Sequence, residues 1–303
     1  SLLEEYASIA HSNGLKQTIL MPFVTVGSLT NFCDVLMAGG TGDGNHSEVG
    51  SSYVHFNFTP HQDKATASLV GDVPRGVLLD QAPIFLGGQG GIAGPCSIAY
   101  GTVIAAGIVM RKDIEQENML LMAAGGAQRV VMRPYCATVF GPVERIIANN
   151  LAYIGNLLAL RAWYRYARSL FLRKTVWGQA CLDGALTRLQ EGYDERVKRL
   201  GQLAAKLAQS VQVAASQGQR TDLPPFLTQE RFAAAWPTIH AALGECTERS
   251  HQPPLAAADI LRRMAVAERP FIEAVQALPS DDKPVLRQWL QSIVDEATGL
   301  FHA

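Results

Sequence analysis

Aliphatic residues recur every six positions between residues 86 and 110 of the chain. The series consists of Leu86, Ile92, Ile98, Ile104 and Met110. A helix repeats every 3.6 residues and a strand every two, so neither element alone explains this period. A six-residue period is typical of a parallel β-helix. Four successive intervals keep the same register, which disfavours two buried strands with chance spacing.

The residues that follow the aliphatic positions support the same interpretation. They are small at Gly87, Ala93, Ala99 and Ala105. In a β-helix, three short strands form a triangular coil, the aliphatic side chain points inward and the small residue lets the chain turn the corner. A single coil cannot bury its own apolar face, so several coils must stack. We therefore expect parallel strands piled along one axis.

The six-residue pattern ends near Asp113, and apolar residues then recur every three or four positions. One such stripe runs from Ile147 to Leu158, and a longer one runs from Leu186 to Val211. This spacing is that of amphipathic helices. Further helices are expected over residues 229–243, 255–278 and 284–300. We predict two domains, a β-helix over residues 1–115 and an α-helical domain over residues 116–303.

The composition limits the kinds of partner. The 303 residues include 26 basic and 27 acidic side chains, so no overall field favours nucleic acid or an anionic membrane. The five cysteines form no C-x-x-C pair, which argues against a disulfide framework and favours a reducing cytoplasm. No targeting or membrane segment is recognised, because Glu4 and Glu5 stand where a signal peptide is basic and the apolar run Leu151–Leu160 is short.

Two segments interrupt the repeat, at residues 37–48 and 55–68. The first is rich in glycine, and the second is polar and carries two histidines and a lysine. Loops that interrupt a solenoid are frequent positions for functional sites. The repeat can also be traced back to Leu3, so the chain is expected to enter the β-helix in the middle of a coil and to lack an N-terminal region.

The runs VGSSYVHFNF and TVIAAGIVMRKD give the first 113 residues a family resemblance. The chain resembles the left-handed β-helix acyltransferases, especially the acetyltransferase domain of the bifunctional N-acetylglucosamine-1-phosphate uridyltransferases. The resemblance implies a left-handed parallel β-helix of hexapeptide repeats followed by an all-α helical domain. The left hand comes from the resemblance alone, because parallel strand crossovers are usually right-handed. Nothing in the chain resembles the nucleotide-binding loop of the uridyltransferase half.

The resemblance also implies acetyl-CoA as the acyl donor, bound between subunits of a homotrimer. Asn57 and Phe58 stand where the family has an Asn-Tyr pair, and the ring of Phe58 lacks the hydroxyl. Ser51 falls at the position of a small backbone-contact residue, and Ala106 at the alanine that lies against the cofactor. Lys64 stands near family lysines that pair with phosphates.

The family's catalytic base is a histidine, and His46 is its nearest counterpart in this chain. A neutral imidazole can take the proton of an amine that attacks the thioester. The resemblance thus implies N-acetylation of an amino sugar or nucleotide amino sugar, related to the UDP-N-acetylglucosamine pathway. Asp34 stands where the family has a substrate-side lysine, and its charge would repel a sugar phosphate.

Two other classes of function stay open at this point. One is a non-catalytic trimeric scaffold or nucleotide-sugar binding module whose helical domain recruits a partner. The other is a metal enzyme similar to the γ-class carbonic anhydrases, suggested by His46, His55 and His61. The spacing of these histidines does not match that family's ligands, so no metal site is predicted.

Overall fold

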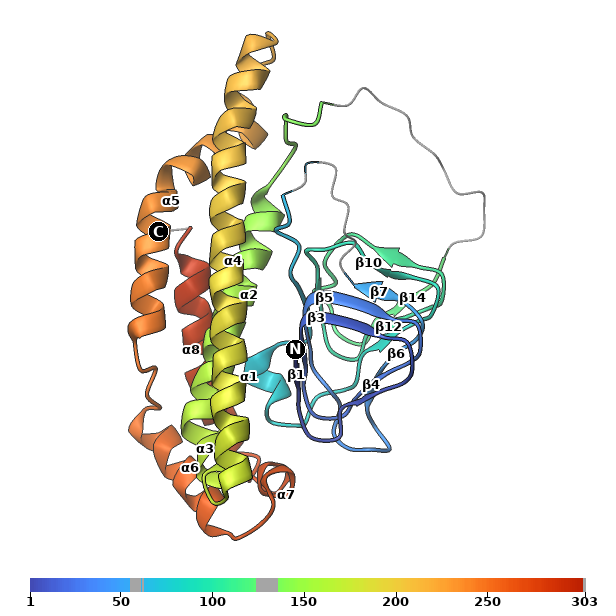
Figure 1. The fold of residues 1–303 in the computed structure, drawn as a ribbon, viewed down its shortest axis with the longest axis vertical. Helices are drawn as coiled ribbons and strands as arrows, with labels where there is room; N and C mark the ends of the chain where they lie inside the picture. The colour runs from blue at the N-terminus through green and yellow to red at the C-terminus, as the bar shows by residue number, and fades with distance from the viewer. Residues whose placement is uncertain (55–60, 62, 124–135, 302–303) are drawn as a thin grey trace.

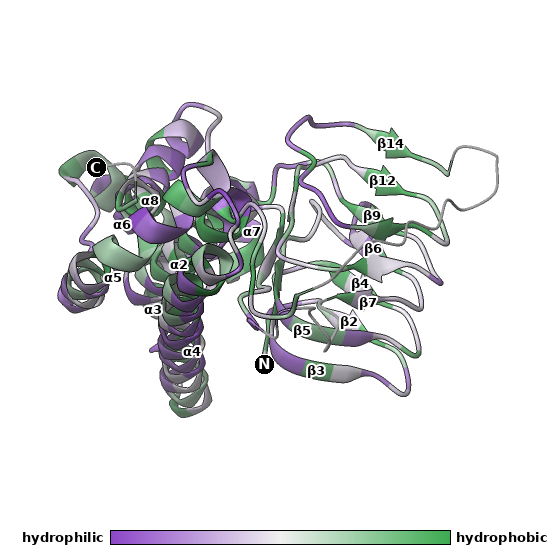
Figure 2. Cartoon of the chain, turned by 90° about the horizontal axis from the view of Figure 1, so that it is seen from above, coloured by the Kyte–Doolittle hydropathy of each residue, from purple (hydrophilic) through white to green (hydrophobic). Residues whose placement is uncertain are grey.

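The computed structural model describes residues 1–303 except for 55–60, 62, 124–135 and 302–303. Short parallel strands fill the N-terminal part, and helices fill the C-terminal part (Figure 1). Seen from above, the strands are stacked on one side and the helices stand together on the other (Figure 2). The chain therefore places two kinds of element side by side.

The strands form two parallel sheets. The eight-stranded sheet contains β1 (Leu2–Leu3), β3 (Gly14–Leu20), β5 (Asn31–Met37), β7 (Tyr53–Val54), β8 (Ser68–Val70), β10 (Gly91–Ile92), β11 (Ser97–Ile98) and β13 (Val109–Met110). The six-stranded sheet contains β2 (Ser8–Ile9), β4 (Val24–Val26), β6 (Ser47–Val49), β9 (Phe85–Leu86), β12 (Val103–Ile104) and β14 (Leu120–Leu121). Most strands are two or three residues long, so stacking provides most of their hydrogen-bond partners.

The helical part begins after the β14 region, and α1 (Val73–Gly76) is the only helix among the strands in the part of the chain that the structure describes. Its elements are α2 (Glu144–Trp163), η1 (Tyr164–Arg168), α3 (Ser169–Leu172), α4 (Val176–Ser216), α5 (Pro224–Glu248), α6 (Leu255–Val266), α7 (Phe271–Gln276) and α8 (Asp282–Gly299). The two long apolar stripes of the sequence lie within α2 and α4. The helix expected over residues 255–278 is divided into α6 and α7, and Pro270 is the N-cap of α7.

The prediction of a left-handed β-helix is wrong. The structure has two parallel sheets of eight and six short strands with a helical C-terminal region, which is an α/β-like fold. The six-residue spacing did mark strands, because each aliphatic residue of the series lies in one and is buried. It did not predict how the strands join. The long strand β5 pairs with β7 through Asn31 and with β8 through Val35. Strands that were expected on two different faces of the β-helix therefore belong to one sheet.

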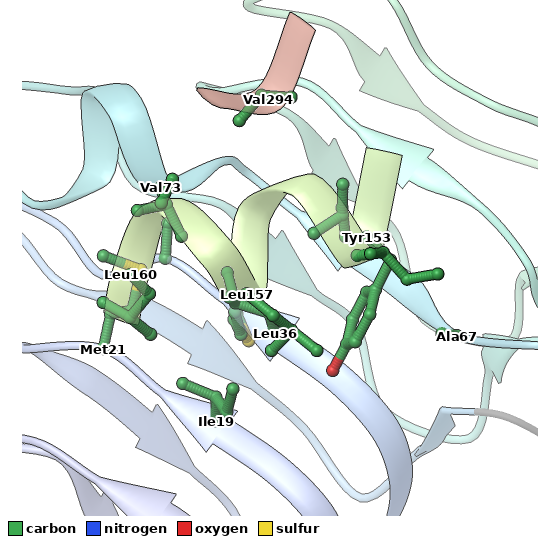
Figure 3. Packing of buried hydrophobic residues seen from close by; sticks show 14 of the residues in the cluster. Ile19, Met21, Leu36, Ala67, Val73, Tyr153, Leu157, Leu160 and Val294 are labelled. Carbon is green, nitrogen blue, oxygen red and sulfur yellow. The ribbon is translucent and has the colours of Figure 1, made fainter. Parts of the chain in front are cut away.

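The face of the eight-stranded sheet packs against α2. Tyr153, Leu157 and Leu160 project from the helix toward Ile19 and Leu36 of the sheet (Figure 3). Leu36 is fully buried and Ile19 is 7% exposed. The sheet and the helices therefore share one apolar core.

On its other side, α2 lies close to α8. A Cβ atom at Gly155 of α2 would come within 2.9 Å of the Cα atom of Val294 in α8. Glycine is therefore required for the two helices to approach so closely. None of the helices in the described part of the chain has both the length and the apolar character needed to cross a membrane.

Candidate functional site

A polar cleft of about 270 Å³ lies between the eight-stranded sheet and α4. Its side chains come from four segments: β3, β5, the residues before β8 and the middle of α4. The lining residues are Lys16, Gln17, Cys33, Asp34, Lys64, Glu195, Arg196 and Arg199. We call this cavity the basic cleft, because four of its eight residues are basic and two are acidic.

Local backbone geometry places the sheet residues of the basic cleft. Lys16 of β3 lies opposite Cys33 of β5 in the parallel ladder. The next residues, Gln17 and Asp34, have φ angles of 49° and 53°, which lie in the left-handed region. Both strands therefore turn at the same level beside α4. On α4, the spacing of Glu195, Arg196 and Arg199 puts these side chains on one face.

A buried ion pair joins the sheet to α4 at the centre of this cleft. Nη2 of Arg196 lies 3.0 Å from Oδ1 of Asp34, and their side chains are 3% and 10% exposed. The same Nη2 lies 3.4 Å from Oε1 of Gln17. Beside them, Arg199 pairs with Glu195 at 2.7 Å. Each of the two carboxylates in the cleft thus pairs with an arginine. The positive charges of Lys16 and Lys64 are not balanced by these carboxylates.

Burial also changes the proton affinity of two groups in the basic cleft. It raises the pKa of Asp34, an effect that the nearby charges of Arg196 and Lys16 oppose. Burial, together with the carboxylate of Asp34, raises the pKa of the Cys33 thiol. A thiol with a raised pKa stays protonated and is a poor nucleophile. The cleft is therefore suited to binding rather than to thiol chemistry.

The basic cleft contains an unsatisfied donor. Within the described residues, the buried Nη1 atom of Arg196 has no hydrogen-bond partner. The ammonium groups of Lys16 and Lys64 likewise form no ion pair with any carboxylate that the structure places. A buried guanidinium nitrogen without an acceptor is costly, and an anion in the cleft would supply that acceptor. The arrangement favours a phosphate or carboxylate ligand.

Among the described residues that the family resemblance predicted as contacts, Lys64 alone lines the basic cleft. Its φ of 57° marks a sharp turn before β8. Asn57 and Phe58, and likewise His55, lie outside the described residues. The repulsion expected from Asp34 does not follow, because Arg196 neutralises it. A cation from α4 therefore lies beside the carboxylate at position 34.

Ser51 and Ala106 are exposed and lie at neighbouring corners of the stack. Residues 88 and 89 lie between them, since the backbone N–H of Gln89 donates to the carbonyl of Ser51 at 2.7 Å and that of Gly107 donates to the carbonyl of Gly88 at 2.9 Å. Neither residue lines the basic cleft. The segment 88–89 thus separates these two predicted cofactor contacts, and Lys64 lines a different site.

His46 lies in the turn before β6. Its Nδ1 atom is 2.7 Å from the carbonyl oxygen of Asp43, which can only accept, so Nδ1 is the donor. In the neutral ring, Nε2 then carries the lone pair, 3.9 Å from Glu48. His61 lies elsewhere, stacked on Phe140 at 4.2 Å. Across the residues that the structure places, no three side chains are grouped as metal ligands.

The arginines of α4 were missed by sequence reasoning. Charged residues at helical spacing usually form a solvated face, so nothing in the sequence separates Arg196 from the other arginines of this helix. Comparisons with protein-family models, with curated proteins and with solved structures find no match to the chain. The candidate site therefore rests on the geometry of the basic cleft.

Proposed function

We propose that this protein is a binding module for a phosphorylated small molecule of the nucleotide-sugar class, held in the basic cleft. The observation that carries the proposal is the buried Nη1 atom of Arg196, which has no acceptor among the described residues. Lys16 and Lys64 line the same cleft, and neither forms an ion pair with a carboxylate among the described residues. The sugar part of the proposal comes from the family resemblance.

The binding mode follows from the three cations. Asp34 and Gln17 lie 3.0 and 3.4 Å from Nη2 of Arg196, so the guanidinium is positioned before a ligand arrives. A planar guanidinium donates to phosphate oxygens with defined geometry, and the two lysines add mobile point charges. This preorganisation lowers the entropy cost of binding.

Isothermal titration calorimetry with UDP-N-acetylglucosamine tests the proposal. We expect saturable binding to the wild-type chain and a loss of at least about tenfold in affinity for the double variant Lys16→Ala/Lys64→Ala. Lys198→Ala is the matched control, because Lys198 lies on the same helix α4 and does not line the cleft. Absence of binding, or equal weakening by the control, would contradict the proposal.

The tautomer of His46 favours a second candidate, acetyl transfer from acetyl-CoA to an amino sugar or nucleotide amino sugar. In that reaction the amine attacks the thioester carbonyl, the C–N bond forms and the C–S bond breaks. The free Nε2 of His46 takes the amine proton and returns it to the departing sulfur. Ser51 and Ala106 are the expected cofactor contacts, together with Asn57 and Phe58.

A coupled assay for free CoA thiol distinguishes the two candidates. Acetyl transfer requires thiol release in the presence of glucosamine or UDP-glucosamine, and its loss in His46→Gln. A folded protein that binds the nucleotide sugar and releases no thiol is a binding module.

We propose in addition that the protein is a homotrimer and lies in the cytoplasm. The cytoplasmic location is supported by the five cysteines, which are all free thiols.

A further inference from the structure

A second and larger cavity, of about 660 Å³, lies between the N-terminal turns, the loop before β6 and α7. Three of its lining residues are aromatic: Tyr6, Phe23 and Phe271. Three others are acidic: Glu5, Asp43 and Glu273. We call it the aromatic–acidic pocket. Its volume lies within the range of small-molecule sites.

Two stacked rings form one wall of the aromatic–acidic pocket. The ring centroids of Tyr6 and Phe23 are 5.1 Å apart, with planes inclined by 7°. Both residues occupy turns with φ angles of 60° and 65°. Phe23 is buried, whereas Tyr6 is 62% exposed, so an aromatic face is available to a ligand. Such faces attract cations through the ring quadrupole.

The charged residues that line the aromatic–acidic pocket are all acidic, and the neighbouring cation Arg168 lies over the ring of Phe271, 4.3 Å from its centroid. Glu5 is already neutralised by Arg168, at 2.6 Å. Asp43 and Glu273 are exposed, and the structure places no cation in an ion pair with either of them. No lysine or arginine is found among the described lining residues. Two carboxylates beside an open aromatic ring therefore give the pocket a negative potential.

Hydrogen bonds hold the two polar walls in place. The side chain of Gln276 in α7 donates to the carbonyl of Thr41 at 2.7 Å, which ties the helix to the loop before β6. Within that loop, His46 donates to the carbonyl of Asp43. The carboxylates of Asp43 and Glu273 are thus carried by segments that are bonded to one another or to the sheet. The pocket is largely preformed.

We propose that the aromatic–acidic pocket binds a small organic cation, an alkylammonium or quaternary ammonium group. The ring of Tyr6 covers the apolar face of the cation, and Asp43 and Glu273 neutralise its charge. This site shares no residue with the basic cleft, so the inference does not depend on the proposed nucleotide-sugar ligand.

Ligand-observed NMR titrations with choline and butylammonium test this site. We compare choline with its uncharged isostere 3,3-dimethyl-1-butanol and expect the isostere to bind at least about tenfold more weakly. Preference for choline would indicate a quaternary ammonium ligand, held mainly by the ring. Preference for butylammonium would indicate a primary amine, held mainly by the carboxylates. Either preference supports the proposal.

Four variants locate the binding. Tyr6→Leu and the double variant Asp43→Asn/Glu273→Gln should each weaken cation binding by about tenfold or more, whereas Tyr6→Phe, which keeps the ring, should bind as the wild type does. Glu230→Gln removes an exposed carboxylate of α5 outside the pocket and serves as the charge control. Because Tyr6, Asp43 and Glu273 are exposed, these variants should fold, which circular dichroism checks. Equal binding of choline and its isostere, or undiminished binding in both Tyr6→Leu and the double variant, would overturn the inference.

Discussion

At the scale of single residues, burial determines which charges are costly and which are useful. Arg196 and Asp34 are both buried, and each supplies the partner that the other needs in a medium where an isolated charge is expensive. Their pairing explains why an acidic residue can line a cleft that favours anions. Removing one partner alone would leave a buried charge, which costs more than the pair contributes.

His251 gives a prediction about pH. Its side chain is 7% exposed, and burial lowers its pKa below the ordinary 6.5. The carboxylate of Glu296, 3.7 Å away, opposes this shift, and the cations Arg161, Arg249 and Arg165 add to it. The folded protein therefore keeps this ring neutral, while the unfolded chain takes up a proton near pH 6.5. This contribution to stability is present above pH 6.5 and is lost as the pH falls.

The measurement is the free energy of unfolding by urea, between about pH 8 and pH 5. We expect His251→Gln to lose less stability on acidification than the wild type does. The difference between the two proteins at pH 8 gives the packing cost of the substitution alone. The hydrogen bond that the indole N–H of Trp289 donates to the backbone carbonyl of residue 251 is kept in the wild type and in the variant. Parallel curves for the two proteins would show that this histidine does not titrate differently on folding.

At the scale of elements, the sequence predicted strands and helices better than it predicted their assembly. The six-residue spacing located β9 to β13, because each aliphatic residue of the series is buried in one of these short strands. It did not predict the two sheets, since β3 and β5 each continue as one seven-residue strand through the turn at Gln17 and Asp34. The long apolar stripes marked α2 and α4, whose faces follow the helical period.

The same limit applies to the candidate site. Lys64 was identified because it stands in a polar loop that resembles a family motif. Arg196 was not, because its importance depends on a partner in β5, more than a hundred positions earlier in the chain. Sequence patterns report on residues that are close along the chain, whereas this cleft is formed by residues that are far apart in sequence and meet only in the folded structure. A charged helix face and a buried arginine are indistinguishable before packing is known.

The contact between α2 and the eight-stranded sheet gives a prediction at this scale. Leu36 of β5 is fully buried and faces Leu157 (Figure 3). Leu36→Ala should reduce the free energy of unfolding by about 2 to 5 kcal/mol, because it removes buried methyl groups and leaves a cavity. Leu227→Ala on α5, where the leucine is 51% exposed, should change it by no more than about 0.5 kcal/mol. Equal effects in urea unfolding would mean that the sheet and α2 do not share a core.

At the scale of the whole molecule, polar bonds as well as apolar packing join the sheets to the helices. The Asn156 side chain of α2 accepts from the backbone N–H of Val73 at 2.7 Å, in a fully buried position. Near the start of the chain, Tyr164 donates to Glu4 at 2.6 Å. Buried groups bonded in this way cannot separate without losing their partners. The two predicted domains are therefore expected to unfold as one cooperative unit.

Expression of residues 1–115 alone tests this cooperativity. The fragment would expose the sheet face that α2 covers, including Leu36, and would leave the N–H of Val73 without its acceptor. We expect it to bind a hydrophobic dye and to melt without a cooperative transition, while the full chain melts in a single step. A fragment with a sharp melt of its own would show instead that the stacked strands fold independently. The full chain would then show two calorimetric transitions, because weakly coupled domains unfold separately.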